Sequence, residues 1–256
     1  MTDALLPHHL DRSILIHAPR ATVFSFLTDS SRWATWWGAG STIDPHAGGK
    51  VYIRHPNGIE AGGRILSIAP PERLVFSYGF NSGVPMPLEA SRVTMSFDDE
   101  AGSTRVRLLH EFAESPVRDE HVQGWRYQLS LFSNVVASVV HEGAAGKVDT
   151  WFAAWAEPDS TTREAMLASV ALPSVQFRDQ YSCVDGFAEL LPHIAAAQRF
   201  MPGMKLTREG DVRHCQGTVL ANWKAIGPDG QSRGQGTNVF TMAPDGRIES
   251  ATGLWN

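Results

Sequence analysis

The stretch TRVRLLHEFAESPVRDEHVQGWRYQLSLFSNVVASVVHE, residues 104–142, decides the fold of the first half of the chain. Up to Phe112 it alternates, so that every second residue from Val106 lies on one apolar face, His110 among them. Between residues 117 and 142 there is no proline, and apolar residues recur at helical spacing. A one-faced strand followed by a long amphipathic helix predicts a helix that lies across a sheet.

The residues before this stretch predict the rest of that sheet. A loose N-terminal arm over residues 1–10 is expected, then a strand, a short helix after Pro19 and a tryptophan-rich turn at 33–37. The alternating segments that follow, with Asn57-Gly58 as a hairpin turn, predict an antiparallel meander with one apolar face. The predicted elements are strand 11–18, helix 21–28, strands 50–54, 59–68, 73–80, 92–97 and 104–112, and helix 116–142.

The pattern starts again after residue 142. The segment HEGAAGK, residues 141–147, is rich in small residues and predicts a flexible joint, so we expect one domain over residues 1–143 and a second over 147–256. The second domain is predicted to place helices before its sheet. Its elements are helices 148–156 and 162–170, strand 174–179, helix 184–200 interrupted at Pro192, strand 204–226 bent or broken at Gly210-Asp211, and strands 232–242 and 247–255.

Composition limits the classes of function. The chain has 256 residues, 43% hydrophobic and 19% charged, which suits two folded α+β domains. A net charge of −5 without a Lys/Arg cluster argues against nucleic acid, and no long apolar run or polybasic helix favours a membrane. Neither the two cysteines nor the histidines show metal-ligand spacing, so no metal or cofactor is expected. Without a signal peptide pattern, the expected location is the cytoplasm.

Six motifs in the first half carry a resemblance to a known family. They are APRATVFSFLTD (18–29), WATWWG (33–38), HAGGKV (46–51), GRILSIAPPERLVFSY (63–78), STRVRLLHEF (103–112) and GWRYQLSLF (124–132). With them, residues 11–140 resemble the activator of heat-shock-protein-90 ATPase homologue branch of the START-like (SRPBCC) superfamily. The resemblance implies a helix-grip fold, in which a curved antiparallel sheet wraps a long C-terminal helix around a cavity.

The second half carries another resemblance. Its motifs are VDTWFAAWAEPD (148–159), SVQFRDQYS (174–182), FMPGM (200–204), GPDG (227–230) and GTNVFTMAPDGRIESATGLW (236–255). Residues 146–256 are thereby similar to SnoaL-like proteins of the nuclear transport factor two-like, or ketosteroid-isomerase-like, superfamily. The resemblance implies a cone-shaped α+β barrel around a cavity, and it implies no single reaction.

Candidate catalytic residues in the second half are Asp179, His193 and Asn238. Asp179 shares a strand face with Phe177, and a carboxylate on an apolar cavity wall is a candidate general base; the alternative is a strand-end aspartate that forms a turn. The resemblance matches Asp179 to the family's proton-shuttling aspartate and matches Asn238 and Trp151 to its oxyanion-hole positions. Trp151 has no hydroxyl group, which departs from the family and argues against steroid isomerisation. His193 is either an alternative acid or base or a structural helix residue.

The remaining candidates bind a ligand or pack in a core. In the second half they are Trp151, Phe177, Trp223 and Phe240, which we expect to line or floor the cone. In the first half His110 is either a buried structural histidine or a polar contact to a ligand, under a helix that presents Trp125. Tyr78 is the other polar group on an apolar face, and the tryptophans at 33–37 are expected to cap the cavity.

Two functions follow from these residues, and a third is set aside. The leading hypothesis is a two-domain protein that binds small hydrophobic molecules, in stress response or secondary metabolism. The alternative is a cofactor-free enzyme of the polyketide-cyclase or isomerase type with Asp179 as general base. A co-chaperone role is disfavoured because the chaperone activator requires a further domain. A homodimer is also expected, through an outer sheet face of the second domain with Val219, Ala221 and Val239.

Overall fold

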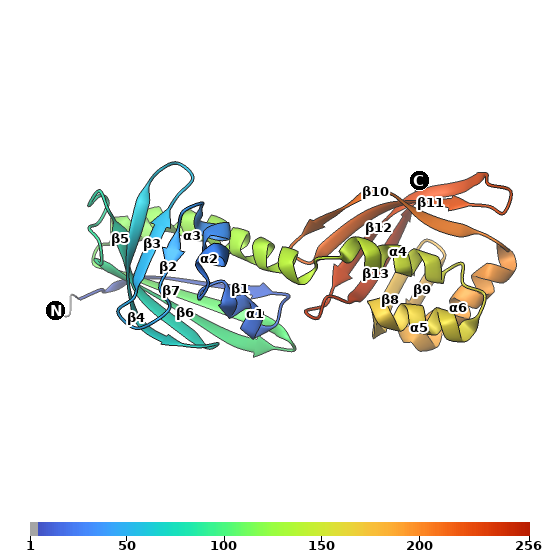
Figure 1. The fold of residues 1–256 in the computed structure, drawn as a ribbon, viewed down its shortest axis with the longest axis horizontal. Helices are drawn as coiled ribbons and strands as arrows, with labels where there is room; N and C mark the ends of the chain where they lie inside the picture. Colours follow the sequence, from blue (N-terminus) through green and yellow to red (C-terminus); the bar gives the residue numbers. More distant parts are fainter. Residues whose placement is uncertain (1–4) are drawn as a thin grey trace. The chain divides into compact units, whose positions relative to one another are not determined.

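The computed structural model describes residues 5–256 and contains two compact units, the first ending at Ala137 and the second spanning Ser138–Asn256. Each unit packs helices against a sheet of its own, as Figure 1 shows. The prediction of an α+β protein is therefore confirmed. Domain bounds at residues 143 and 147 stay a proposal, because the division into units falls a few residues earlier.

The first unit is a seven-stranded sheet in the order β1-β7-β6-β5-β4-β3-β2, with every pair antiparallel. Its long helix, α3, comes last in the chain, an arrangement consistent with a helix-grip fold. The elements are β1 (His8–Ile16), α1 (Arg20–Ser25), α2 (Ser30–Trp37), β2 (Thr42–Ile43), β3 (Lys50–Arg54), β4 (Glu60–Ala69), β5 (Arg73–Phe80), β6 (Ser91–Glu100), β7 (Ser103–Phe112) and α3 (Ser115–Val140).

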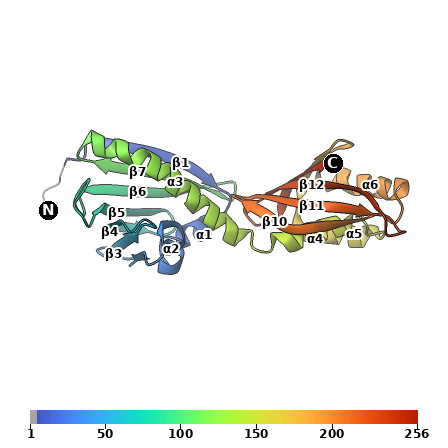
Figure 2. The same cartoon turned by 90° about the horizontal axis from the view of Figure 1, so that it is seen from above.

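Helix α3 runs along one face of this sheet (Figure 2). Its buried side chains include Trp125, Leu129, Phe132 and Val136, which repeat every three or four residues and so form one stripe. Phe132 contacts the rings of Phe26 and Trp36, with ring centroids 6.2 and 4.6 Å away. The stripe therefore buries the helix against the core that the alternating strands provide.

Two predictions in the first unit are wrong in detail. The tryptophan-rich segment is a helix, α2, because the Asp29 side chain caps it by accepting hydrogen bonds from the backbone N–H groups of Ser31 and Arg32. The predicted loose arm at residues 1–10 is partly strand, since β1 begins at His8 and pairs with Phe112 at the end of β7. Residues 1–4 of that arm lie outside the described residues.

The second unit has a six-stranded sheet in the order β10-β11-β12-β13-β8-β9. Only the pair of β13 and β8 is parallel. Its elements are α4 (Ala144–Ala154), α5 (Ser160–Val170), β8 (Ala171–Asp179), β9 (Ser182–Asp185), α6 (Gly186–Phe200), β10 (Lys205–Cys215), β11 (Thr218–Ile226), β12 (Ser232–Met242) and β13 (Ile248–Trp255). A cone-shaped barrel of the SnoaL-like type is a proposal for this unit.

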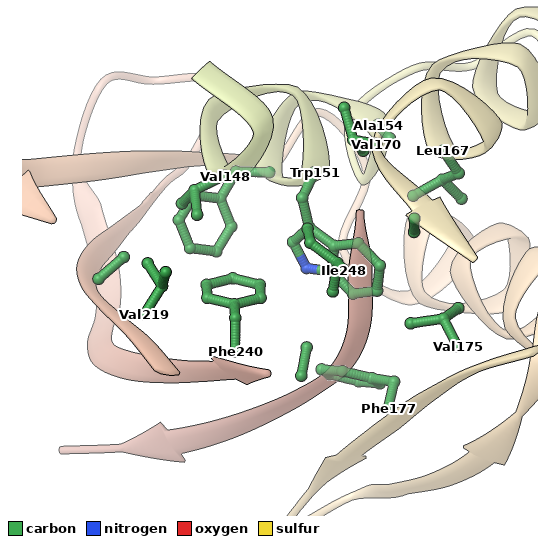
Figure 3. Packing of buried hydrophobic residues seen from close by; sticks show 14 of the residues in the cluster. Val148, Trp151, Ala154, Leu167, Val170, Val175, Phe177, Val219, Phe240 and Ile248 are labelled. Atoms are coloured by element: carbon green, nitrogen blue, oxygen red, sulfur yellow. The ribbon is translucent and has the colours of Figure 1, made fainter. Parts of the chain in front are cut away.

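Helices α4 and α5 pack against the inner face of this sheet, with Trp151, Phe177 and Phe240 at the centre of the cluster (Figure 3). Val219 lies in the same cluster and is fully buried, as is Ala221. The prediction that these two residues face outward for a dimer is therefore wrong. In a strand the faces alternate residue by residue, so the half-buried residues between them occupy the other face.

The hairpin of β10 and β11 turns later than predicted. The chain reverses at Gln216 and Gly217, both with positive φ, whereas Gly210 lies within β10 where the register shifts between Glu209 and Arg213. Gly210 also has a positive φ, of 67°, which glycine adopts without strain. The Gly-Asp pair therefore marks a bulge inside one long strand.

The segment at residues 141–147 packs within the second unit, and its role as a flexible joint stays a prediction. His141 is 3% exposed, and its Nε2 atom lies 3.2 Å from the carbonyl oxygen of Ala243, after β12. Lys147 donates a hydrogen bond to the carbonyl group of Gly246. Both side chains hold the segment against the β12–β13 loop of the second unit, and helix α4 already begins at Ala144.

Candidate functional site

The first unit contains a cavity of about 410 Å³ bounded by α2, α3 and the β3–β4 hairpin. Pockets of a few hundred cubic ångströms are typical of sites for small organic molecules. The lining is largely aromatic, which suits an apolar ligand. Its residues are Thr35, Trp36, Trp37, Gly38, His55, Pro56, Asn57, Tyr78, His121, Gly124, Trp125, Tyr127, Gln128 and Leu131.

Polar atoms on this lining lack partners within the described part of the chain. The indole N–H of Trp37 is buried and donates to no acceptor, and Nε2 of His121 is likewise unpartnered. The Nδ1 atom of His121 lies 2.7 Å from the carbonyl oxygen of Val117, which can only accept, so Nε2 is the unprotonated nitrogen of the neutral ring. The wall of the cavity thus contains one unpartnered donor and one unpartnered acceptor, both of them buried.

Tyr78 adds a hydroxyl group to this cavity. Its side chain is 4% exposed, and burial raises its pKa well above the ordinary value of 10.0. The ring contacts those of His110 and His121 at centroid distances of 5.5 and 6.1 Å. Tyr78 therefore stays a neutral phenol that can donate and accept at the cavity wall.

His110 holds Trp125 in place. The indole N–H of Trp125 donates to Nδ1 of His110 over 2.9 Å, so the ring proton must be on Nε2, which donates to Oγ of Ser91 over 2.8 Å. The Ser91 hydroxyl group then donates to the carbonyl oxygen of Tyr78 over 2.9 Å. Both ring nitrogens are used, and His110 is not one of the residues that line the cavity. We therefore assign it to positioning Trp125.

Burial in the first unit favours neutral histidines. Burial, together with the nearby His121, lowers the pKa of His110 well below 6.5. Burial also lowers the pKa of His121, although its hydrogen bond to Val117 and the charge of Glu120 act in the opposite direction. His55, on the cavity lining, has its pKa lowered by burial as well. These rings resist protonation in the folded unit.

The first unit is accordingly expected to lose stability as pH falls below 6.5. The unfolded chain takes up protons on these histidines near pH 6.5, whereas the folded unit does not, so unfolding becomes more favourable with each step toward acid. His110 alone contributes up to about 1.4 kcal/mol per pH unit. Amide hydrogen exchange of β6 and β7 between pH 7.5 and 5.5, corrected for intrinsic rates, measures the effect. A free energy of opening that does not change between pH 7.5 and 5.5 contradicts this prediction.

A second cavity, of about 140 Å³, lies inside the second unit between α4, α6 and the inner face of the sheet. Its lining is again rich in aromatic residues. It consists of Trp151, Trp155, Phe177, Ala197, Gln198, Met201, Met204, Leu206, Trp223, Ala225, Arg233, Asn238, Gly253 and Trp255. No acidic residue of the described chain belongs to this lining.

Asn238 is held by Trp223 in this cavity. The indole N–H of Trp223 donates to Oδ1 of Asn238 over 2.8 Å, and because an indole N–H can only donate, the amide NH₂ group must be the other end. The side chain is 5% exposed, so this orientation matters for what the cavity offers. The indole N–H of Trp155, also on the lining, is buried without an acceptor.

Asp179 lies at the end of β8, next to the wall of this cavity but not on its lining. Its Oδ1 accepts from the backbone N–H of Tyr181 over 2.8 Å, and its Oδ2 accepts from the indole N–H of Trp255 over 3.3 Å. Arg178, its neighbour in the chain, pairs with Asp185 instead. Asp179 is half-buried. Its Oδ1 atom forms a turn contact, and its Oδ2 atom contacts Trp255, which does line the cavity.

The other predicted site residues lie either on the lining of one of the two cavities or in the core. Trp151, Phe177 and Trp223 line the second cavity, and Tyr78 and Trp125 line the first. Phe240 packs on Trp151 within the core and is not on the lining. His193 bonds to Oγ of Ser182 through Nε2 over 2.8 Å, and it too lies off the lining. Its catalytic role stays a prediction.

Sequence reasoning missed Trp37, His121 and Trp155 as polar groups. All three belong to apolar helical stripes, where an aromatic side chain is normally read as core. Within residues 5–256 no group of three or more His, Cys, Asp or Glu residues is arranged to hold a metal ion. In the same residues no helix combines the length and apolar character needed to cross a membrane.

Comparison with known proteins places the first unit in a family context. Residues 17–137 match the family model of the Activator of Hsp90 ATPase homolog 1-like protein, slightly less than half of the chain. The match ends where the first unit ends and agrees with the resemblance seen for residues 11–140. No curated protein sequence matches the chain.

Solved structures resemble about half of the chain at a time. A putative isomerase of the SnoaL-like family from Agrobacterium tumefaciens is 24% identical with a TM-score of 0.43, covering 46% of this chain and 98% of its own. CalU16 from Micromonospora echinospora is 26% identical with a TM-score of 0.42, covering 49% and 75%. An HSP90 activator from Plasmodium falciparum is 21% identical with a TM-score of 0.39, covering 46% and 86%.

Proposed function

We propose that this chain binds small, mostly hydrophobic molecules, one in the cavity of each unit. The observation that carries the proposal is the first cavity: about 410 Å³ of aromatic-lined space whose wall holds an unpartnered indole N–H, an unpartnered imidazole nitrogen and a neutral phenol. A buried donor without a partner costs roughly 1–3 kcal/mol, and a ligand that supplies the partner recovers that cost. The first site therefore suits an apolar ligand that carries a hydroxyl group.

A second candidate function is a cofactor-free reaction in the second cavity with Asp179 as general base. It is supported by the place of the carboxylate beside the wall: a Cβ atom built on Gly253 would lie 3.2 Å from Oδ1 of Asn238 and 3.3 Å from Cβ of Asp179. Gly253 itself is on the lining, so the amide oxygen of Asn238 and the Cβ atom of Asp179 both lie close to one point of the cavity wall. His193 is an alternative acid or base in this proposal.

Three naphthalenes of similar size test the first site. We expect 2-naphthol, which donates and accepts, to bind more tightly than 2-methoxynaphthalene, which only accepts, and naphthalene to bind most weakly. The indole N–H resonance of Trp37 in the ¹⁵N-labelled full chain is expected to shift with the two oxygen-bearing probes. Trp37→Phe removes the donor and is expected to weaken 2-naphthol binding about fivefold, the usual size of one hydrogen bond.

The Gly124→Leu variant tests whether the probes bind inside this cavity. A Cβ atom at this α3 position would meet no heavy atom within 4 Å, so leucine fills the cavity rather than straining the core. Leucine also favours helix by up to about 1 kcal/mol over glycine. The variant is expected to stay folded and to bind naphthol at least tenfold more weakly. Equal binding of all three probes, or unchanged binding to this variant, contradicts the first site.

We further propose that the chain forms a homodimer through its second unit and that its two domains span residues 1–143 and 147–256. Val239 is half-buried on the face of β12 opposite to Asn238 and Phe240. A dimer through the second unit accordingly uses that face of the sheet, and Val219 and Ala221 have no part in it.

A further inference from the structure

We infer that His141 and His214 share one proton, and that this histidine bridge holds the segment at residues 141–147 in place until rising pH removes the proton. The two residues come from distant parts of the chain: His141 directly follows the last residue of α3, and His214 is the last residue but one of β10. Nδ1 of His141 lies 3.0 Å from Nε2 of His214. Neither residue lines the two cavities described above.

The outer contacts of the two rings fix where their hydrogens lie. Nε2 of His141 lies 3.2 Å from the carbonyl oxygen of Ala243, which can only accept, so this nitrogen carries a hydrogen. The backbone N–H of Gly217 donates to Nε2 of His214 over 3.2 Å, so that nitrogen carries none. If both rings were neutral, the two facing nitrogens would present lone pairs to each other. One proton on Nδ1 of His141 turns this repulsion into a charge-assisted hydrogen bond.

The geometry of the pair suits a proton and not a metal ion. The ring centroids are 5.2 Å apart, close to the largest separation that two rings can have when their nitrogens are 3.0 Å apart. The two lone pairs therefore point at each other. Metal-ligating imidazoles point instead at a third atom, which for zinc lies about 2.0–2.1 Å from each nitrogen. No third His, Cys, Asp or Glu residue of the described chain completes a metal site here.

The end of α3 favours a positive charge on His141. A cation next to a helix C-terminus interacts favourably with the carbonyl groups of the last turn, and α3 is 26 residues long. Because His141 is 3% exposed, water screens this interaction weakly. Burial acts in the opposite direction and lowers the pKa of His214. For the first proton the hydrogen bond and the helix end offset burial, whereas a second proton would also meet the charge of the first.

The charged groups around the histidine bridge largely compensate one another. Strand alternation turns both chain neighbours of His214 to the opposite face of β10. Arg247 and then Lys147 hold the pKa of Asp245 below its ordinary value, against the effect of burial. Lys147 opposes a proton on the bridge and Asp245 favours one, so the facing lone pairs and the helix end decide. The titratable groups on the segments that meet at the bridge are Glu142, Lys147, Arg213, Cys215, Asp245 and Arg247.

The protonated bridge connects the segment at residues 141–147 to two parts of the sheet. His141 opens the segment, His214 and Gly217 belong to the β10–β11 hairpin, and Ala243 belongs to the β12–β13 loop. A shared proton gives the pair a folded-state pKa above the value of about 6.5 for an unfolded histidine. The stability it contributes is then fully present below pH 6.5 and is lost as pH rises through the folded-state pKa. The segment is therefore held near neutral pH and loosens in alkali.

Ring ¹⁵N resonances of the full chain, followed from pH 5 to 9, test the shared proton directly. The pair is expected to take up one proton with an apparent pKa above about 6.5, mainly at Nδ1 of His141, and to resist a second. Two independent titrations, or a first proton that binds only below pH 6.5, overturn the inference. Because this measurement uses the natural chain, it does not depend on how a variant folds.

Hydrogen exchange tests what the proton does to the segment. After correction for intrinsic rates, the backbone amides of residues 141–147 are expected to be at least about tenfold less protected at pH 8.5 than at pH 6.5, the size of one hydrogen bond to a charged group. His214→Gln offers His141 an N–H that does not titrate, so protection is expected to change less than twofold over the same range. His46→Gln makes the same change at an exposed histidine of the first unit and is expected to retain the full dependence. Protection that is independent of pH in the natural chain, or as pH-dependent in His214→Gln as in His46→Gln, contradicts the bridge.

Discussion

Replacing His110 by leucine is expected to lower the free energy of unfolding of the first unit by about 3 kcal/mol. The substitution removes the acceptor of the Trp125 indole N–H and the donor to Ser91, both within the buried interior. An orphaned buried donor costs about 1–3 kcal/mol, and the lost packing of the ring adds to that. Amide hydrogen exchange of β6, β7 and α3 in the full chain measures the change.

The same substitution in a Trp125→Phe background separates the hydrogen bond from the packing. Phenylalanine leaves no N–H to be orphaned, so His110→Leu is expected to cost about 1 kcal/mol less there than in the natural chain. Equal costs in both backgrounds show that the histidine acts through packing alone. A natural-background cost below about 0.5 kcal/mol contradicts the positioning role altogether.

The role of His110 illustrates how far the sequence leads. Alternation from Val106 to Phe112 correctly predicts that the ring lies on the buried face of β7. It does not reveal whether the ring nitrogens face a ligand or neighbouring side chains, because that depends on Ser91 and Trp125, which come from other elements. The structural alternative considered for His110 is the one its hydrogen bonds favour.

The tryptophans show even more clearly that the sequence does not reveal the hydrogen-bond partners of a buried side chain. The chain has eight, and the indole nitrogens of Trp33, Trp36, Trp125, Trp223 and Trp255 find acceptors within the described residues. Those of Trp37 and Trp155 are buried and find none. All are aromatic residues at core-like positions, and only the three-dimensional placement of carbonyl groups and side chains decides which N–H remains unpartnered.

Local structure was predictable wherever one signal dominated. Hairpin strands follow from alternation, and α3 from its apolar stripe. The helix α2 was within reach of sequence reasoning, since Asp29 precedes tryptophans spaced by three and four residues. The position of the β10–β11 turn could not be predicted, because Gly210-Asp211 is as good a turn signal as Gln216-Gly217. Cross-strand register decides between the two.

The second candidate function gives the proposed general base, Asp179, a defined task. In that proposal the amide NH₂ group of Asn238 donates to the oxygen of a ketone and stabilises its charge when an adjacent C–H bond loses its proton and an enolate forms. Asp179 is the carboxylate next to the wall of the second cavity, through Gly253 and Trp255. The proton passes from the α-carbon of the ketone to the carboxylate, and return of a proton to the same carbon completes an exchange without any cofactor.

Asp179→Asn is therefore expected to slow protein-catalysed exchange of the α-protons of 2-indanone in D₂O by about 100-fold, the usual lower range for loss of a general base. The amide keeps one acceptor oxygen for the turn at Tyr181 but places an NH₂ group opposite the indole N–H of Trp255, so the free energy of unfolding is expected to fall by about 1 kcal/mol. Proton NMR of the ketone follows the exchange, and titration of the same variant follows binding, which is expected to change only a few-fold. Asp185→Asn is the control, because that carboxylate is exposed and paired with Arg178. Exchange no faster with the natural chain than in buffer, or equally fast with Asp179→Asn, contradicts a base at this position and leaves the second cavity as a binding site.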